Sequence, residues 1–362
     1  MTTPRSSADY YRRQQRLLAL LIAAIRRTWR RMDPNARWDE QYADDGIAAQ
    51  LLMLVTAAQV AAARDADVYV AAVLAELAVD PAATPGIIVP SAFSGVAGDG
   101  RPVESLLALA VPRAGRTFLD LQNAALPASE ELERPEWMSD TTWESLNRER
   151  SDRLRADFER NRERAAEQAL VLAGRWLETA AATAVIDAAR AAESAASMAS
   201  ESVEGYVRML NPPSCSRCAV LAGRFYRWNE GFERHPLCDC RHIPVSESIA
   251  GDLTVNPNTY FDSLEAADQD RIFTIAGANA IRDGADIGQV VNARRGMQRA
   301  QDGAHAGLLI TREGITRRGA ANRRRTGRNA VVRLMPETIY DLADGDRAEA
   351  MRLLRLNGFL AA

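Results

Sequence analysis

Residues 139–210 read SDTTWESLNRERSDRLRADFERNRERAAEQALVLAGRWLETAAATAVIDAARAAESAASMASESVEGYVRML and contain no Pro. The first half alternates Arg with Asp and Glu, a pattern typical of a solvent-exposed helix face. The second half is rich in Ala and other small residues, which suits close helix packing. The stretch predicts one very long helix or two helices in a hairpin with a hinge near Gly174, and Ser139 or Asp140 is the expected N-cap.

The segments before this stretch also show helical periodicity. Apolar residues recur at helical spacing from Tyr10 to Met32, which predicts an amphipathic helix. A second helix is expected to pack against it. The remaining expectations are a helix from about Asp44 to Ala78, a loop over 80–100 with at most a short strand at Ile87–Val89, a helical segment over 102–126 broken at Pro112, and a Pro-containing connection over 127–138.

After Pro257 the sequence predicts helices over 263–280, 287–299 and 336–357, with Gly358 at a C-cap position. We therefore expect a mainly α protein with an extended helical N-terminal body, a small Cys/His-stapled α+β module and a helical C-terminal tail. The expected parts are an N-terminal helical region (1–126), the long helix or hairpin (127–210), a Cys/His module with its following helices (211–300), and an Arg-rich arm with a C-terminal helix (301–362).

Composition narrows the function classes. The 362 residues are 47% hydrophobic and carry a net charge of −3, which argues against a disordered acidic tail or a globally basic nucleic-acid binder. All 45 basic residues are Arg, as GC-rich coding would give. The apolar run Leu17–Ile25 is far shorter than the ~20 residues of a membrane span. Four arginines follow it where a signal peptide would be cleaved, so neither a membrane span nor secretion is expected.

The four cysteines all fall within 26 residues, and two histidines lie among them. The order is Cys215-x2-Cys218, then His235, Cys238-x-Cys240 and His242. A Cys-x2-Cys knuckle that faces a second Cys/His pair across about 15–20 residues is a common structural zinc site. The expected ligands are Cys215 and Cys218 with two of His235, Cys238 and Cys240.

His242 is a reserve ligand or an ordinary surface histidine. The intervening residues 223–228, followed by Gly231, predict a β-hairpin with an aromatic face. Such a zinc site would be structural, with no open position for water. Disulfides formed in oxidising surroundings and reduced packing cysteines remain the alternatives.

These residues also carry a family resemblance. The order Cys215-x2-Cys218, Leu-Ala-Gly-Arg-Phe-Tyr at 221–226, and His-Pro-x-Cys-x-Cys at 235–240 resembles the C-terminal module of minor head proteins similar to protein F of phage Mu. The segments 260–297 and 336–340 look like the versions carried by phages of actinobacteria. The motif resemblance covers about 205–300, and the N-terminal 200 residues share only helical character and the stretch 95–107.

The resemblance implies a structural virion protein at the portal vertex inside a tailed-phage head, present in host cytoplasm during assembly. It implies the portal protein and the major capsid protein as partners, non-specific contact with packaged DNA, and release with that DNA. No enzyme is expected, because the third histidine, His305, has no evident nucleophile partner. The alternatives are a zinc-containing nuclease of the HNH or treble-clef kind, a phage-borne effector, and a helical scaffold unrelated to phage.

Residues 294–333 hold eleven arginines and two acidic residues. Their Gly, Thr and Asn neighbours suggest a flexible arm that binds phosphate without reading bases. An acidic partner such as the portal protein, or solvent alone, would fit the same composition. The candidate binding residues are Arg317, Arg318, Arg323, Arg324, Arg325 and Arg328.

Overall fold

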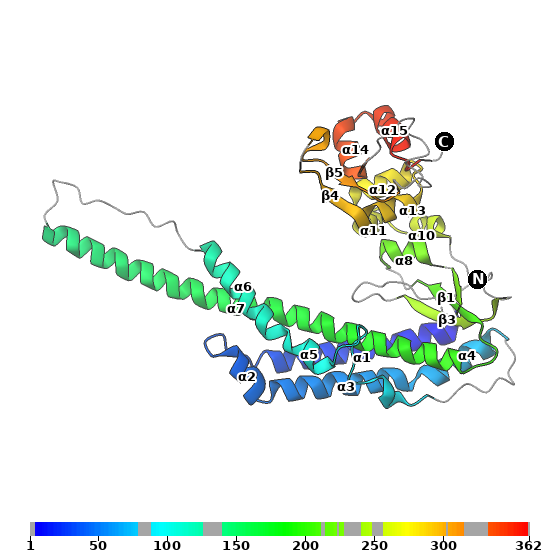
Figure 1. The fold of residues 1–362 in the computed structure, drawn as a ribbon, viewed down its shortest axis with the longest axis horizontal. Coiled ribbons are helices and arrows are strands. Elements are labelled where there is room, and N and C mark those ends of the chain that lie inside the picture. Colours follow the sequence, from blue (N-terminus) through cyan, green and yellow to red (C-terminus); the bar gives the residue numbers. More distant parts are fainter. Residues whose placement is uncertain are drawn as a thin grey trace.

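The protein is mainly α-helical, as expected, in a computed structural model. The structure describes residues 4–78, 88–125, 140–210, 214–222, 224–227, 240–247, 256–301, 303–314 and 332–360. A platform of helices lies along one very long helix, and a smaller C-terminal lobe of short helices and strands stands above one end of it (Figure 1). A small sheet lies between platform and lobe.

The long helix α7 runs without interruption from Asp140 to Met198, so the hairpin alternative is wrong. Its 59 residues span about 90 Å at the α-helical rise. Its alanine-rich second half is buried against other platform helices, chiefly α6 and α3, and also α1 and α4. The helix ends earlier than the expected position near Leu210, because residues Gly205–Met209 form strand β1 instead.

The platform begins with helix α1, Arg5–Trp29, whose apolar face is buried as the periodicity predicts. The single helix expected from Asp44 to Ala78 is wrong, since it divides at Asp65, whose carboxylate pairs with Arg13 of α1 at 2.9 Å. Glu76, near residue 78 at the end of the segment, also contacts the start of α1. Its side chain accepts hydrogen bonds from the backbone N–H groups of Arg5 and Ser6. The helices that follow α1 are α2 (Trp38–Asp44), α3 (Ile47–Arg64) and α4 (Ala66–Glu76).

After a 3₁₀ turn, η1 (Pro90–Phe93), two helices complete the platform: α5 (Val103–Ala108) and α6 (Ala110–Ala125). No strand forms at Ile88 and Val89, and Ile87 lies outside the described residues. The expected break at Pro112 is wrong and falls at Leu109 instead. Pro112 is accommodated because it lies in the first turn of α6, where its missing N–H has no intrahelical acceptor.

Two helical stretches of described residues, Ile47–Glu76 and Arg148–Met198, are long and apolar enough to cross a membrane by length and composition. Both contribute buried residues to the platform core, and core helices meet the same criterion.

The small sheet has strand order β2-β1-β3, with β1 antiparallel to both neighbours. Strand β2 is Phe225–Arg227 and β3 is Arg241–Val245. The aromatic strand β2 lies within the expected hairpin over 223–231 and pairs with β1 from before the cysteines, while the second half of that hairpin lies outside the described residues. One face of the sheet, including Val207 and Ile243, packs on α4 and the end of α7.

The C-terminal lobe contains more, shorter elements than the sequence predicts. The last expected helix divides at Asp344, which takes a left-handed conformation before Gly345. Gly358 has a φ of +73°, which confirms its predicted C-cap geometry. The lobe consists of α10 (Pro257–Asp262), α11 (Ala266–Phe273), α12 (Ile275–Arg282), α13 (Ile287–Ala293), η3 (Arg294–Gly296), η4 (Gly303–His305), α14 (Pro336–Ala343), α15 (Arg347–Leu356), and a sheet of β4 (Met297–Arg299), β5 (Leu309–Thr311) and β6 (Arg333–Leu334).

Gly174, the expected hinge, has a packing role instead. A Cβ atom built there would lie 2.7 Å from Cδ1 of Trp29, the last residue of α1. The indole of Trp29 is buried, and its Nε1 donates a hydrogen bond to the backbone oxygen of Leu170 at 2.9 Å. The glycine thus lets α1 and α7 approach closely enough for this bond.

We predict that Gly174→Ala lowers the free energy of unfolding by about 1–3 kcal/mol, because Trp29 must move out of its pocket. Gly115→Ala in α6 is the matched control, since a Cβ there meets nothing within 4 Å. Better helix propensity should make the control more stable by up to about 1 kcal/mol. Urea unfolding followed by circular dichroism compares the two variants, and equal effects would contradict the packing role.

Candidate functional site

The first two cysteines of the motif lie together at the start of helix α8, Ser216–Leu221. Cys215 is the N-cap residue, and its sulfur accepts a hydrogen bond from the backbone N–H of Cys218 at 3.4 Å. The two Sγ atoms are 3.3 Å apart, longer than the ~2.05 Å of a disulfide. Two thiolates on one tetrahedral zinc ion would be roughly 3.8 Å apart, so a small adjustment would let both bind the same metal.

The side of the small sheet that faces away from the platform carries aromatic and basic side chains. Tyr206 stacks on Tyr226 of β2 and on His242 of β3, with ring centroids 5.4 and 4.0 Å away. Arg208 follows Tyr206 on the same face and lies opposite His242 in the strand register. Both Arg208 and His242 are buried, which is unusual for a guanidinium group.

The guanidinium group of Arg208 connects this face to the cysteines. Its Nη2 lies 3.3 Å from the sulfur of Cys218, and only 1% of Arg208 is exposed. The arrangement therefore supplies a positive charge where a metal site made of thiolates would carry excess negative charge.

Two platform residues hold strand β3 by its backbone. The hydroxyl of Tyr69 in α4 donates to the backbone oxygen of His242 at 2.6 Å. Arg190 in α7 donates to the backbone oxygen of Cys240 at 3.2 Å and pairs with Asp187 at 3.5 Å. Because these contacts fix β3 and Cys240, the residue directly before it, the platform positions part of the cysteine module.

The structure brings together some of the predicted ligands. Cys215, Cys218 and Cys240 belong to one hydrophobic cluster, although 22 positions separate Cys218 from Cys240 in the sequence. His235 and Cys238 lie outside the described residues. Within the described part of the chain, no three side chains of His, Cys, Asp or Glu form a group that could hold a metal ion. His242, the reserve ligand, packs on Tyr206.

Arg208, Arg190 and Tyr69 were not identified from the sequence. The only sequence feature that marks Arg208 is its position as a charged residue inside the apolar run 205–210. The sequence predicts a helix for that run, so it does not indicate a buried position on a strand. Arg190 and Tyr69 come from distant helices, so their hydrogen bonds to β3 follow from tertiary structure alone.

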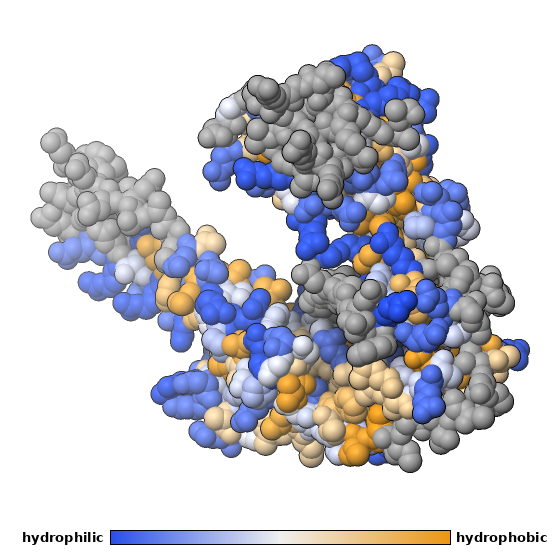
Figure 2. All heavy atoms as spheres, turned by 45° about the vertical axis from the view of Figure 1, so that its right-hand side comes forward, coloured by the Kyte–Doolittle hydropathy of each residue, from blue (hydrophilic) through white to orange (hydrophobic). Residues whose placement is uncertain are grey.

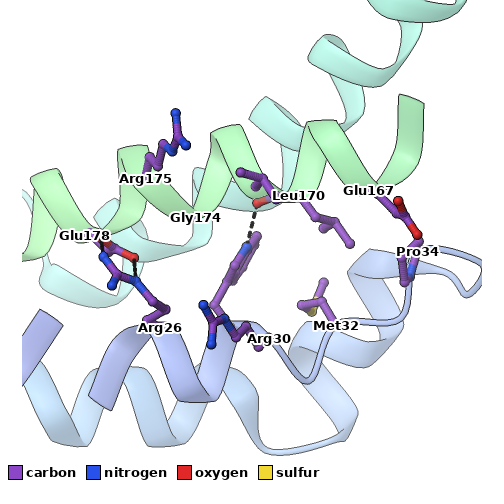
Figure 3. Close-up of a pocket in the computed structure, with 11 residues that line it drawn as sticks. Arg26, Arg30, Met32, Pro34, Glu167, Leu170, Gly174, Arg175 and Glu178 are labelled. Atoms are coloured by element: carbon purple, nitrogen blue, oxygen red, sulfur yellow. Dashed lines mark hydrogen bonds and ion pairs between the residues drawn. The ribbon is translucent and has the colours of Figure 1, made fainter. Parts of the chain in front are cut away.

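A cavity of about 710 Å³ lies between the end of α1 and the middle of α7. Its floor includes Trp29, Met32 and Leu170, and arginines stand at its rim (Figure 3). Arg26 is held by Glu178 through two hydrogen bonds of 2.8 and 2.7 Å. The arrangement offers an apolar surface beside positive charge and contains no recognisable set of catalytic groups among the described lining residues.

The Arg-rich stretch divides into two parts. The six arginines predicted to bind DNA or a partner, Arg317, Arg318, Arg323, Arg324, Arg325 and Arg328, lie outside the described residues. Arg294 pairs with Glu337 at 2.6 Å, and Arg333 is buried. The guanidinium group of Arg333 donates to backbone oxygens of Asn357 and Glu313 and stacks over Phe359, and burial lowers its pKa to about 10. These two arginines therefore stabilise the lobe, so the stretch is not a flexible arm throughout.

Comparison of the chain with protein families, curated proteins and solved structures finds no match.

We predict that Arg208→Met lowers the free energy of unfolding by about 1.5–3 kcal/mol, because the variant loses the buried hydrogen bond from the charged guanidinium group to the Cys218 sulfur. Arg227→Met is the matched control on the neighbouring strand. Arg227 is 65% exposed and pairs with Glu247 at 3.3 Å, so its loss should cost less than about 1 kcal/mol. Equal stability of Arg208→Met and the parent chain would contradict a stabilising contact between Arg208 and Cys218.

Proposed function

We propose that this chain is a structural, non-enzymatic minor head protein of a tailed bacteriophage, similar to Mu protein F. The observation that carries the proposal is the cysteine motif, whose described members Cys215, Cys218 and Cys240 belong to one buried cluster beside the cation of Arg208. This cluster coincides with the part of the sequence that resembles the phage proteins. A protein of this kind needs stable surfaces for assembly rather than a reaction centre.

The module would be stapled by one structural zinc ion. Cys215 and Cys218 would supply two ligands, and two of His235, Cys238 and Cys240 would supply the others. Zinc contributes folding free energy and needs no open coordination position in such a site. Support comes from the sulfur pair on α8 and from the Arg208 guanidinium, which would compensate the charge of a thiolate-rich site.

The expected location is the head interior at the portal vertex, with the portal protein and the major capsid protein as partners. The platform supports this assignment because its helix α7, about 90 Å long, presents an extended helical surface for contact with other proteins. The basic segment with Arg317, Arg318, Arg323, Arg324, Arg325 and Arg328 would contact packaged DNA or an acidic surface of the portal.

Head assembly gives the direct test of this function. We expect the chain, co-expressed with the portal and major capsid proteins of the proposed phage, to sediment with assembled heads, and to be missing from heads that form without portal. The reason is that the proposed contacts with the portal and capsid proteins are both at the portal vertex, which such heads lack. Exclusion from portal-containing heads would contradict the proposal, and so would metal-dependent DNA cleavage by the purified chain.

We predict about one zinc ion per chain in protein purified under reducing conditions, measured by elemental analysis. The double variant Cys215→Ser, Cys218→Ser should lose the metal and unfold at a lower temperature, because the module loses the folding free energy of metal binding. His305→Ala is the control, as His305 lies outside the motif. A well-folded parent chain without metal would contradict the zinc assignment.

A further inference from the structure

Part of the N-terminal half of α7, residues 148–164, projects from the platform as an exposed helical segment, which we call the arm. Every residue from Ser151 to Arg164 is exposed. Figure 1 shows this part of the helix extending past the other platform helices, and Figure 2 shows it standing out from the body of the molecule. The same helix is buried on one face from Ala165 onward, so the arm is a rigid extension of a packed element.

Two large apolar side chains lie on one face of the arm. Leu154 is 47% exposed and Phe158 is 45% exposed. They are four residues apart, so they are neighbours one turn apart on the helix surface. We call this pair the arm seam. If Leu154 and Phe158 are taken as heptad positions d and a, Asn161 and Ala165 continue the stripe, so only two large apolar residues form the seam.

Charge is distributed unevenly around the seam. At 100° per residue, five arginines fall beside it in the e and g positions, with a single acidic residue, Asp157, among them. Most acidic residues of the arm lie on the opposite side of the helix. The flanking arginines are Arg148, Arg155 and Arg162 at e, and Arg150 and Arg164 at g; the acidic residues away from the seam are Glu149, Asp152, Glu159 and Glu163.

The ion pairs of the arm leave most of this flanking charge available. Among the described residues, Arg162 pairs with Glu159, and no ion pair forms with Arg148, Arg150, Arg155 or Arg164. Pairs between residues three or four apart stabilise an exposed helix by only about 0.3–0.5 kcal/mol each. An apolar seam between two rows of arginine is the surface that a complementary helix would cover.

We propose that the arm binds an acidic amphipathic helix of a partner protein, which places Leu or similar residues on the seam and Asp or Glu opposite the flanking arginines. A second copy of this chain does not fit. In an antiparallel pair, e faces e and g faces g, so arginine meets arginine on both sides. In a parallel pair, Arg150 would face Arg155 of the second copy. The opposite charges that would also meet there, Asp157 and Arg162, already form ion pairs with Arg160 and Glu159 of their own helix.

DNA fits the arginines but not the seam. Phosphate contacts require basic groups and place no large apolar residue between them. Leu154 and Phe158 would then remain in contact with water and phosphate. The acidic helix satisfies both the seam and its flanks, and this inference stands independently of the proposed phage function.

The test uses the full chain and a fluorescein-labelled synthetic helical peptide with Leu at a and d and Glu at e and g. A second peptide carries Lys in place of Glu. Fluorescence anisotropy should show binding of the Glu peptide at least about tenfold tighter than binding of the Lys peptide. The variant Leu154→Asp, Phe158→Asp should weaken Glu-peptide binding by at least about tenfold.

Two further variants complete the test. Leu20→Asp, Met53→Asp replaces residues that are 71% and 61% exposed elsewhere on the platform, and it should leave binding unchanged. Arg148→Glu, Arg155→Glu, Arg162→Glu should reverse the preference between the two peptides. Equal binding of both peptides, or no effect of the seam variant, would overturn the proposal.

Two alternative occupants give distinct results. A dimer of the parent chain in sedimentation velocity that dissociates in the seam variant would assign the seam to a second copy and overturn the proposal. Duplex DNA that displaces the Glu peptide, and whose binding is lost in the arginine variant but kept in the seam variant, would assign the arm to phosphate and also overturn it.

Discussion

The close packing of other elements on the alanine-rich half of α7 is the constraint on which the structure depends. Small side chains such as Ala173 and Ala181 let α1, α3 and α6 approach the same helix from different sides. Gly174 is the extreme case, because even a methyl group there would collide with Trp29. Protein interiors tolerate little change in side-chain volume, so this half of α7 sets how closely the other platform helices can pack on it.

The cysteine module inherits its position from that platform. Arg190 of α7 and Tyr69 of α4 hold successive parts of strand β3, and the apolar face of the sheet packs on the same two helices. The other face carries Arg208, whose guanidinium group lies close to Cys218 of α8. A sheet of three short strands would be weak alone. Its stability therefore comes from the helices on one side and from the sulfur-containing cluster on the other.

The sequence predicts the elements whose signal is local and leaves out those that depend on distant partners. The periodicity of α1, the long Pro-free α7 and the C-cap at Gly358 are all local features, and all are present. Strand β1 was assigned to the helix because its five residues have no turn signal, and its strand character comes from pairing with β2 and β3.

The same distinction applies to the site. The spacing of Cys215 and Cys218 predicts that they lie close together, since three residues span one helical turn. The burial of Arg208 and Arg333 was not predictable, because a buried arginine requires acceptors from other elements. For Arg333 these are backbone oxygens of Asn357 and Glu313, both more than 15 positions away.

The two parts of α7 have opposite surface chemistry for a physical reason. A helix that must be packed on several sides needs small residues, and one that must remain helical without neighbours needs charges paired along its own surface, as Arg160 and Asp157 are. Because the two parts form one continuous helix, any force on the arm is transmitted directly to the helix that holds β3 through Arg190. A partner bound at the arm would therefore be mechanically connected to the cysteine module without any intervening hinge.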